Sequence, residues 1–173
     1  MTAVPALARG RELFLRKAWG ESCRLLEAAD RDAPLEPDDL ERLATAAFLM
    51  GRDDESEGFR TRAHQMFLAR GDSEGAARSA ALLAFGLMQR GARAPASGWF
   101  TRAERILDEA HLDCVIRGFL LIPSAIQRIV QGDPSAGHDV FTQAVGLLLE
   151  ATATRSPRRT PDSNEGGRKG PRH

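Results

Sequence analysis

The chain has 173 residues, of which 42% are apolar, so it is long enough for one sizeable hydrophobic core. Residues 1–151 carry 18 Lys and Arg against 22 Asp and Glu, a formal charge of −4, which leaves no general basic surface for nucleic acid. The N-terminus lacks the apolar stretch of a signal peptide and no apolar run approaches a membrane span, so we expect a soluble, cytoplasmic protein.

Helix-favouring residues dominate the sequence, because Leu and Ala supply most of its apolar positions and strand-favouring residues are sparse. The first predicted pair of helices ends at Asp32-Ala33-Pro34. Pro37 then opens the third helix, at a position that needs no N–H group. In chain order the predicted helices cover roughly residues 5–18, 20–31, 37–51, 54–70, 73–91, the segment around 99–107, 112–131 and 133–150.

A set of three residues repeats four times along these helices. In each set a small residue is followed four positions later by a bulky residue and three positions after that by alanine, which keeps the set on one helical face. Another small residue lies twelve positions before each set, a distance that suits a tight turn and an antiparallel return. The sets are Ser22-Leu26-Ala29, Ser56-Arg60-Ala63, Ala96-Phe100-Ala103 and Gly137-Phe141-Ala144, preceded by Gly10, Ala44, Ala84 and Ala125.

This repeat predicts helical hairpins, because a small residue on each of two antiparallel helices lets their backbones approach closely. Successive sets lie 34, 40 and 41 residues apart. The first interval equals the tetratricopeptide period, and the longer ones imply helices extended by one or two turns. We therefore expect an all-α fold, an α-solenoid of about four tetratricopeptide-like hairpins.

Turn signals support the hairpins. In three of the four repeats a glycine five residues before the set is expected to end one helix, and in two of these an aspartate is expected to cap the next. The first repeat has Lys17 in place of the glycine, so its turn signal is weaker. The glycines are Gly51, Gly91 and Gly132, and the aspartates are Asp53 and Asp133.

The helical pattern ends after Glu150. Residues 152–173 contain three prolines, three glycines and Ala153 as their one apolar residue, with six Lys and Arg against two acids. No core can be built from that composition. The sequence therefore predicts a tetratricopeptide-like helical repeat domain over 1–150 and a disordered, basic, Pro- and Gly-rich tail over 151–173.

Several stretches of the chain look like the tetratricopeptide-type region of large LuxR-type helix-turn-helix transcriptional regulators. They are residues 40–49 (LERLATAAFL), 51–56 (GRDDES), 84–87 (AFGL), 98–103 (GWFTRA) and 113–118 (DCVIRG). The resemblance covers about residues 7–148. In that family the repeats sense or bind partners and a C-terminal helix-turn-helix domain binds DNA.

The resemblance implies a protein-interaction or sensor module, but nothing apolar and periodic follows Glu150 that could form the DNA-binding domain. We therefore expect no specific nucleic-acid binding by this chain and no membrane partner. A truncated gene or a shifted reading frame would explain the Arg- and Pro-rich ending.

The concave face of such a solenoid is lined by the first helix of each hairpin and is the usual binding surface. We expect a protein or peptide partner to contact Arg42, Thr45, Phe48 and Arg78 there. An alternative is a small-molecule-binding regulatory domain with a pocket between the hairpins, which a dry apolar cavity would favour.

The sequence carries no constellation typical of an enzyme, so we expect no catalytic residues, no cofactor and no metal. The acids of residues 53–58 look like a calcium loop, but its twelfth position is His64 instead of the required Glu, and they suit a helix N-terminus better. The histidines are expected in solvent or in turns. We expect Trp19 and Trp99 to pack between hairpins.

The last predicted helix ends in an apolar set too wide for one stripe. It comprises Val145, Leu147, Leu148 and Leu149. Part of it should face the preceding hairpin and the rest, which would face a next repeat, should remain uncovered, and an exposed apolar patch drives association. We therefore expect self-association through this uncapped C-terminal helix.

Overall fold

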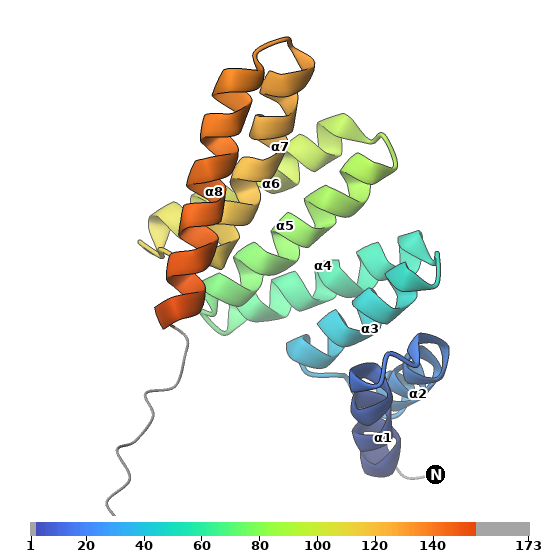
Figure 1. Ribbon diagram of the computed structural model, residues 1–173. Helices are drawn as coiled ribbons and strands as arrows, with labels where there is room; N and C mark the ends of the chain where they lie inside the picture. The colour runs from blue at the N-terminus through green and yellow to red at the C-terminus, as the bar shows by residue number, and fades with distance from the viewer. Residues whose placement is uncertain (1–2, 155–173) are drawn as a thin grey trace, which may run out of the picture.

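The computed structural model describes residues 3–154, with side chains from 5 to 147, and these residues form eight α-helices without any strand. The helices pair as antiparallel hairpins that stack one after another, from α1 and α2 at one end to α7 and α8 at the other (Figure 1). This confirms the predicted all-α helical repeat. The helices are α1 (Ala3–Leu15), α2 (Trp19–Asp32), α3 (Pro37–Leu49), α4 (Asp53–Ala69), α5 (Ser73–Gln89), α6 (Arg93–Glu109), α7 (Val115–Val130) and α8 (Pro134–Thr154).

The helices of each hairpin cross at the small residues twelve positions apart. In the first hairpin the Ser22 hydroxyl donates a hydrogen bond to the Gly10 carbonyl at 2.9 Å. In the second, the Ser56 hydroxyl donates to the Ala44 carbonyl at 2.8 Å. A hydroxyl reaches the backbone of the facing helix only when the two helices lie in close contact, so these bonds confirm the predicted crossing points.

The third and fourth hairpins have no hydroxyl at the corresponding positions. Ala84 and Ala96 are both buried in the third hairpin. In the fourth, a Cβ atom added to Gly137 would lie 3.0 Å from the carbonyl oxygen of Ala125 and would also clash with the Ile129 side chain. Glycine at this position therefore sets how closely α7 and α8 approach.

Ion pairs between arginines and acids join the first two hairpins. Arg11 on α1 donates to both carboxylate oxygens of Asp39 on α3, and Arg62 on α4 does the same for Asp30 on α2. Burial disfavours the charged form of Asp39, but hydrogen bonds and charge from Arg11 and Arg42 outweigh it and lower the pKa of its carboxyl. These pairs fix how neighbouring hairpins align.

The turns follow the predicted glycine pattern with one correction. The glycines that end helices have positive φ, and Lys17, at the equivalent place in the first hairpin, also does, with φ 59°. Asp133 caps α8 as predicted, because its carboxylate accepts from the N–H of Ala136 at 2.9 Å. The prediction for Asp53 was wrong, because Arg52 is the N-cap of α4 and Asp53 is already its first helical residue. The glycines are Gly51, Gly71, Gly91 and Gly132.

The last helix is longer than expected. α8 continues to Thr154, four residues beyond the predicted end at Glu150, so the first residues of the expected tail are helical. The remainder of that tail, 155–173, lies outside the described residues, as do the side chains of Leu148 and Leu149. Of the helices in residues 3–154, none has both the length and the apolar character to cross a membrane.

Replacing Gly137 with Ala should destabilise the protein by roughly 1–3 kcal/mol, because the new methyl group meets a backbone carbonyl that cannot move aside. Gly146 on the same helix provides the control, since a Cβ there meets nothing within 4 Å. Gly146→Ala should leave stability unchanged or raise it by up to about 1 kcal/mol. Urea unfolding measures both, and equal midpoints for the two variants would contradict the close crossing.

Candidate functional site

The four predicted partner-binding residues do not form one cluster. Thr45 and Phe48 on α3 both contact Arg60 of α4. Arg42 turns instead to Asp39, to which it donates at 2.7 Å. Arg78 on α5 lies over the ring of Phe67, 5.6 Å from its centroid, and pairs with Asp38 at 3.5 Å. The structure therefore brings Thr45 and Phe48 together around Arg60, which the sequence analysis treated only as a packing residue.

Arg60 is a buried cation with few hydrogen bonds. Its side chain is only 8% exposed, and its guanidinium lies 5.8 Å from the centroid of the Phe48 ring. The group donates to the hydroxyls of Ser56 at 3.3 Å and Thr45 at 3.4 Å, and its Nε has no hydrogen-bond acceptor. A guanidinium has five N–H donors, so most of the hydrogen-bonding capacity of Arg60 is unused.

The counterion of Arg60 is Glu41 on α3, whose side chain is also nearly buried. Glu41 Oε2 lies 3.6 Å from Arg60 Nε, and Glu41 Oε1 accepts a hydrogen bond from the Ser79 hydroxyl on α5. Burial raises the pKa of the Glu41 carboxyl against the opposing effects of Ser79 and Arg60, and burial likewise lowers the pKa of Arg60. This charged cluster therefore joins three helices from two hairpins.

At the positions that Arg60 and Glu41 occupy in the second hairpin, the other hairpins have apolar residues. Arg60 occupies the bulky position of the repeat, which is Leu26, Phe100 or Phe141 elsewhere. Glu41 lies three residues before Ala44, and the equivalent residues of the other hairpins are Leu7, Ala81 and Ile122. A charged residue at a repeat position that is otherwise apolar is the signal by which the sequence could have revealed this cluster.

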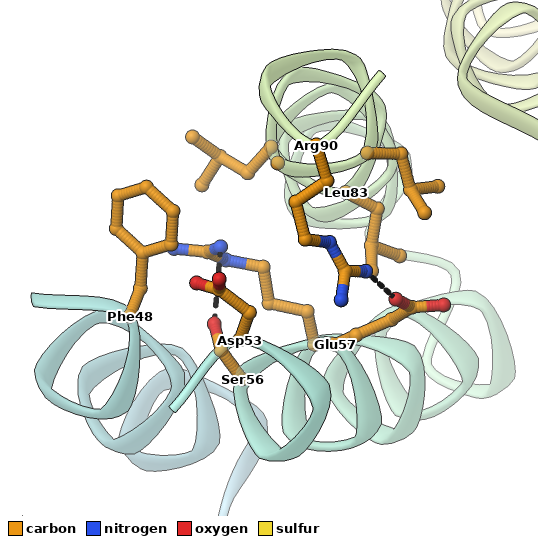
Figure 2. A pocket seen from close by; sticks show the side chains of 10 residues that line it. Phe48, Asp53, Ser56, Glu57, Leu83 and Arg90 are labelled. Carbon is orange, nitrogen blue, oxygen red and sulfur yellow. Dashed lines mark hydrogen bonds and ion pairs between the residues drawn. The ribbon is translucent and has the colours of Figure 1, made fainter. Parts of the chain in front are cut away.

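A small polar hollow lies beside Arg60, between α3, α4 and α5. Phe48, Asp53, Ser56 and Glu57 line it together with Leu83 and Arg90 of α5 (Figure 2). Its volume of about 20 Å³ holds a single water-sized group. Arg90 pairs with Glu57 and with Asp54, the latter at 2.6 Å. This polar hollow therefore contains one partly unsatisfied guanidinium and one that two carboxylates neutralise.

A second, apolar hollow lies on the other side of α5, between α5 and α7. It has a volume of about 240 Å³, and Arg78 and Glu74 are the charged residues in its lining. The rings of Phe85 and Phe119 meet edge to face within it, with their centroids 6.0 Å apart. Leu82 borders both hollows, so they form neighbouring parts of one surface. The apolar hollow is lined by Glu74, Arg78, Ala81, Leu82, Phe85, Val115, Ile116 and Phe119.

His64 does not occupy the solvent or turn position expected for it. It is buried on α4, where Nδ1 lies 2.9 Å from the Ala76 carbonyl oxygen and Nε2 has no hydrogen-bond partner. Its ring meets that of Trp99 edge to face at 5.2 Å, so Trp99 packs between neighbouring hairpins as predicted. Trp19 instead contacts Phe14 within its own hairpin, at 5.3 Å.

Metal ligation and thiol chemistry find little support among the described side chains. No three of the described His, Cys, Asp and Glu residues group closely enough to hold a metal ion. Acids of the calcium-like segment pair with arginines instead, as Glu55 does with Arg52. Burial, with the charge of Glu27, raises the pKa of the Cys23 thiol to about 11, so this cysteine stays protonated and unreactive at neutral pH.

Removing one member of the Glu41–Arg60 pair should cost about 3–5 kcal/mol, because the other charge is left buried without a counterion. The double variant Glu41→Leu/Arg60→Leu copies the first hairpin, which has Leu7 and Leu26 at these positions. It should be at least as stable as the parent. Unfolding in guanidinium chloride measures all four proteins, and single variants as stable as the parent would show that the charges are not buried together.

Stability should fall as the solution is acidified below about pH 6.5, the usual pKa of histidine. Burial lowers the pKa of His64 in the folded protein, so the unfolded chain binds a proton more readily than the folded one. The contribution of neutral His64 to the free energy of unfolding is complete above about pH 6.5 and is lost as the pH falls toward the lowered pKa. Unfolding between pH 7.5 and 5 measures this loss. The His64→Phe variant should have a smaller loss, whereas the exposed control His138→Gln should match the parent. An unchanged loss in His64→Phe would exclude His64 as its origin.

Comparison with known proteins does not assign this chain to a family. The sequence matches no protein-family model, and it matches no curated protein at a significant level. Inference about function therefore rests on the fold and on the two hollows beside α5. Their lining residues come from hairpins two, three and four, which the repeat brings together.

Proposed function

We propose that this protein is a peptide- or protein-binding module that works without catalysis. Its binding surface is the face formed by α3, α5 and α7, with the two hollows on either side of α5. The observation that carries the proposal is the apolar hollow, in which Phe119 remains 41% exposed beside Phe85. Aromatic and aliphatic pockets of this kind typically hold the anchor side chains of protein partners.

The size of the apolar hollow favours a side chain over a free ligand. Pockets for small molecules usually have volumes of about 300–1,000 Å³ and enclose most of the ligand. The present hollow, at about 240 Å³, falls below that range. A small-molecule-binding regulatory domain is the second candidate, because the hollow is mainly apolar and lies between two hairpins.

The sequence resemblance to the repeat region of LuxR-type regulators supports a role as an interaction or sensor module. A cytoplasmic location also remains a proposal, based on the lack of a signal-peptide-like stretch in the sequence. Self-association through the uncapped C-terminal helix, α8, also remains a proposal. Val145 of this helix is 50% exposed, whereas Leu147 is partly covered.

A library of random dodecapeptides displayed on phage tests the proposed function against the immobilised full chain. Enriched peptides should carry a large apolar anchor residue. The Phe119→Ala variant should weaken their binding at least about tenfold, which corresponds to roughly 1.4 kcal/mol. The matched control is Val130→Ala on the same helix, since Val130 is 80% exposed and lies outside both hollows.

Two results would overturn the peptide-binding proposal. One is the absence of any enriched peptide after repeated selection. The other is equal binding of the enriched peptides to the parent and to Phe119→Ala. Thermal stabilisation by small apolar compounds, lost in Phe119→Ala, would favour the second candidate instead.

A further inference from the structure

An apolar stripe on α7 begins in the apolar hollow and continues beyond it. Its residues share one face of the helix, because their positions fall within about 100° of the circumference of an α-helix. Val115 and Phe119 line the hollow, whereas Ile126 and Val130 lie outside it. This α7 stripe runs for about 22 Å along the helix axis. It comprises Val115, Phe119, Ile122, Pro123, Ile126 and Val130.

Neighbouring helices cover other faces of α7 but leave the α7 stripe open. Leu120 packs into the core, and Ala125 lies against Gly137 of α8. On the stripe, Ile126 is 45% exposed and Val130 is 80% exposed. The C-terminal half of α7 extends past the hairpin of α5 and α6 (Figure 1), so a second molecule can approach it. Contiguous exposed apolar surface of this kind typically marks a site of protein contact.

The α7 stripe matches itself when two copies of the helix lie antiparallel. With a two-fold axis at the centre of the stripe, between residues 122 and 123, Phe119 lies opposite Ile126 of the second copy, because both are equally far from the axis. In the same way Val115 lies opposite Val130 of the second copy. Val130 is the most exposed member of the stripe, and Val115 lines the apolar hollow. A protrusion on each copy therefore meets the hollow of the other.

The charges of α7 are compatible with this pairing. Its charged residues, Arg117 and Arg128, lie on the face opposite the stripe, and Arg117 pairs with Asp108 at 2.8 Å. Antiparallel α7 helices therefore bring apolar side chains together without placing like charges in contact. We propose that two copies of the chain associate through the α7 stripe as a two-fold symmetric dimer, in which the same surface of each copy contacts the other.

The size of the contact predicts a weak dimer. A standard interface covers about 800 Å² of each partner, and one helical stripe with the rim of a hollow supplies less. We therefore expect a dissociation constant in the micromolar range. The dimer covers Phe119 and the apolar hollow, so a peptide anchored there competes with the second copy. The dimer itself does not depend on the proposed function, because it needs no peptide.

Sedimentation equilibrium of the full chain tests the dimer, and the parent should shift from monomer to dimer as its concentration rises. Ile126→Glu places a carboxylate opposite Phe119 of the second copy and should raise the dissociation constant at least about tenfold. The matched control is Val145→Glu on α8, which is 50% exposed and should associate like the parent. A parent that stays monomeric at several hundred micromolar would overturn the proposal. So would association weakened in Val145→Glu and unchanged in Ile126→Glu, which would place the contact on α8.

A mixture of two variants tests the antiparallel arrangement. Neither Phe119→Lys nor Ile126→Glu should dimerise alone. Mixed in equal amounts, they should form a heterodimer, because the introduced lysine lies opposite the introduced glutamate while the other Phe119–Ile126 contact remains apolar. Neither a parallel arrangement nor a fold damaged by the substitutions would give this rescue. A mixture that stays monomeric would show that the antiparallel pairing is wrong.

Val130→Lys provides a further variant whose fold should be intact, because Val130 is 80% exposed. It should also weaken the dimer, and circular dichroism checks that its helix content equals that of the parent. An unchanged dissociation constant in this variant would contradict the contact between Val130 and the hollow. Because these measurements use no peptide, the absence of any enriched peptide would overturn the proposed function alone.

Discussion

The fold depends on the close approach of the two helices in each hairpin. Where α1 meets α2 and α3 meets α4, a serine hydroxyl on one helix reaches a backbone carbonyl on the other. Where α7 meets α8, only glycine fits at position 137. Such contacts tolerate little added volume, because protein interiors are close-packed. Each hairpin is consequently a firm unit, and the surfaces that it presents to its neighbours follow from its crossing point.

The crossing region of the second hairpin contains charged residues where the other hairpins have apolar ones. Arg60 and Glu41 occupy positions that Leu26 and Leu7 hold in the first hairpin. A buried ion pair gains little stability over an apolar pair of similar size, because desolvation offsets the attraction between the charges. The long 3.6 Å separation and the unused donors of Arg60 point the same way. The cluster therefore adds little stability beyond what an apolar pair at these positions would give.

Much of the helical layout could be predicted from spacing alone, whereas the candidate site could not. The twelve-residue offset between Ala44 and Ser56 predicted a contact that the structure contains. Thr45 and Phe48 were placed on the binding face, but Arg60, which they contact, belongs to the second helix of the hairpin and was assigned to packing. His64 was expected near solvent and is buried, because polarity alone does not predict which helix faces α5 covers.

The sequence by itself determined the number, order and pairing of the helices, because periodicity and turn residues act over a few neighbouring positions. It also determined which small residues meet within a hairpin. Only the tertiary structure decided what lies between hairpins: Ser79 of α5 on Glu41 of α3, Phe119 of α7 on Phe85 of α5, and a polar hollow beside Arg60. These contacts depend on how one hairpin is rotated and shifted against the next, and that geometry results from the packing of whole helix faces.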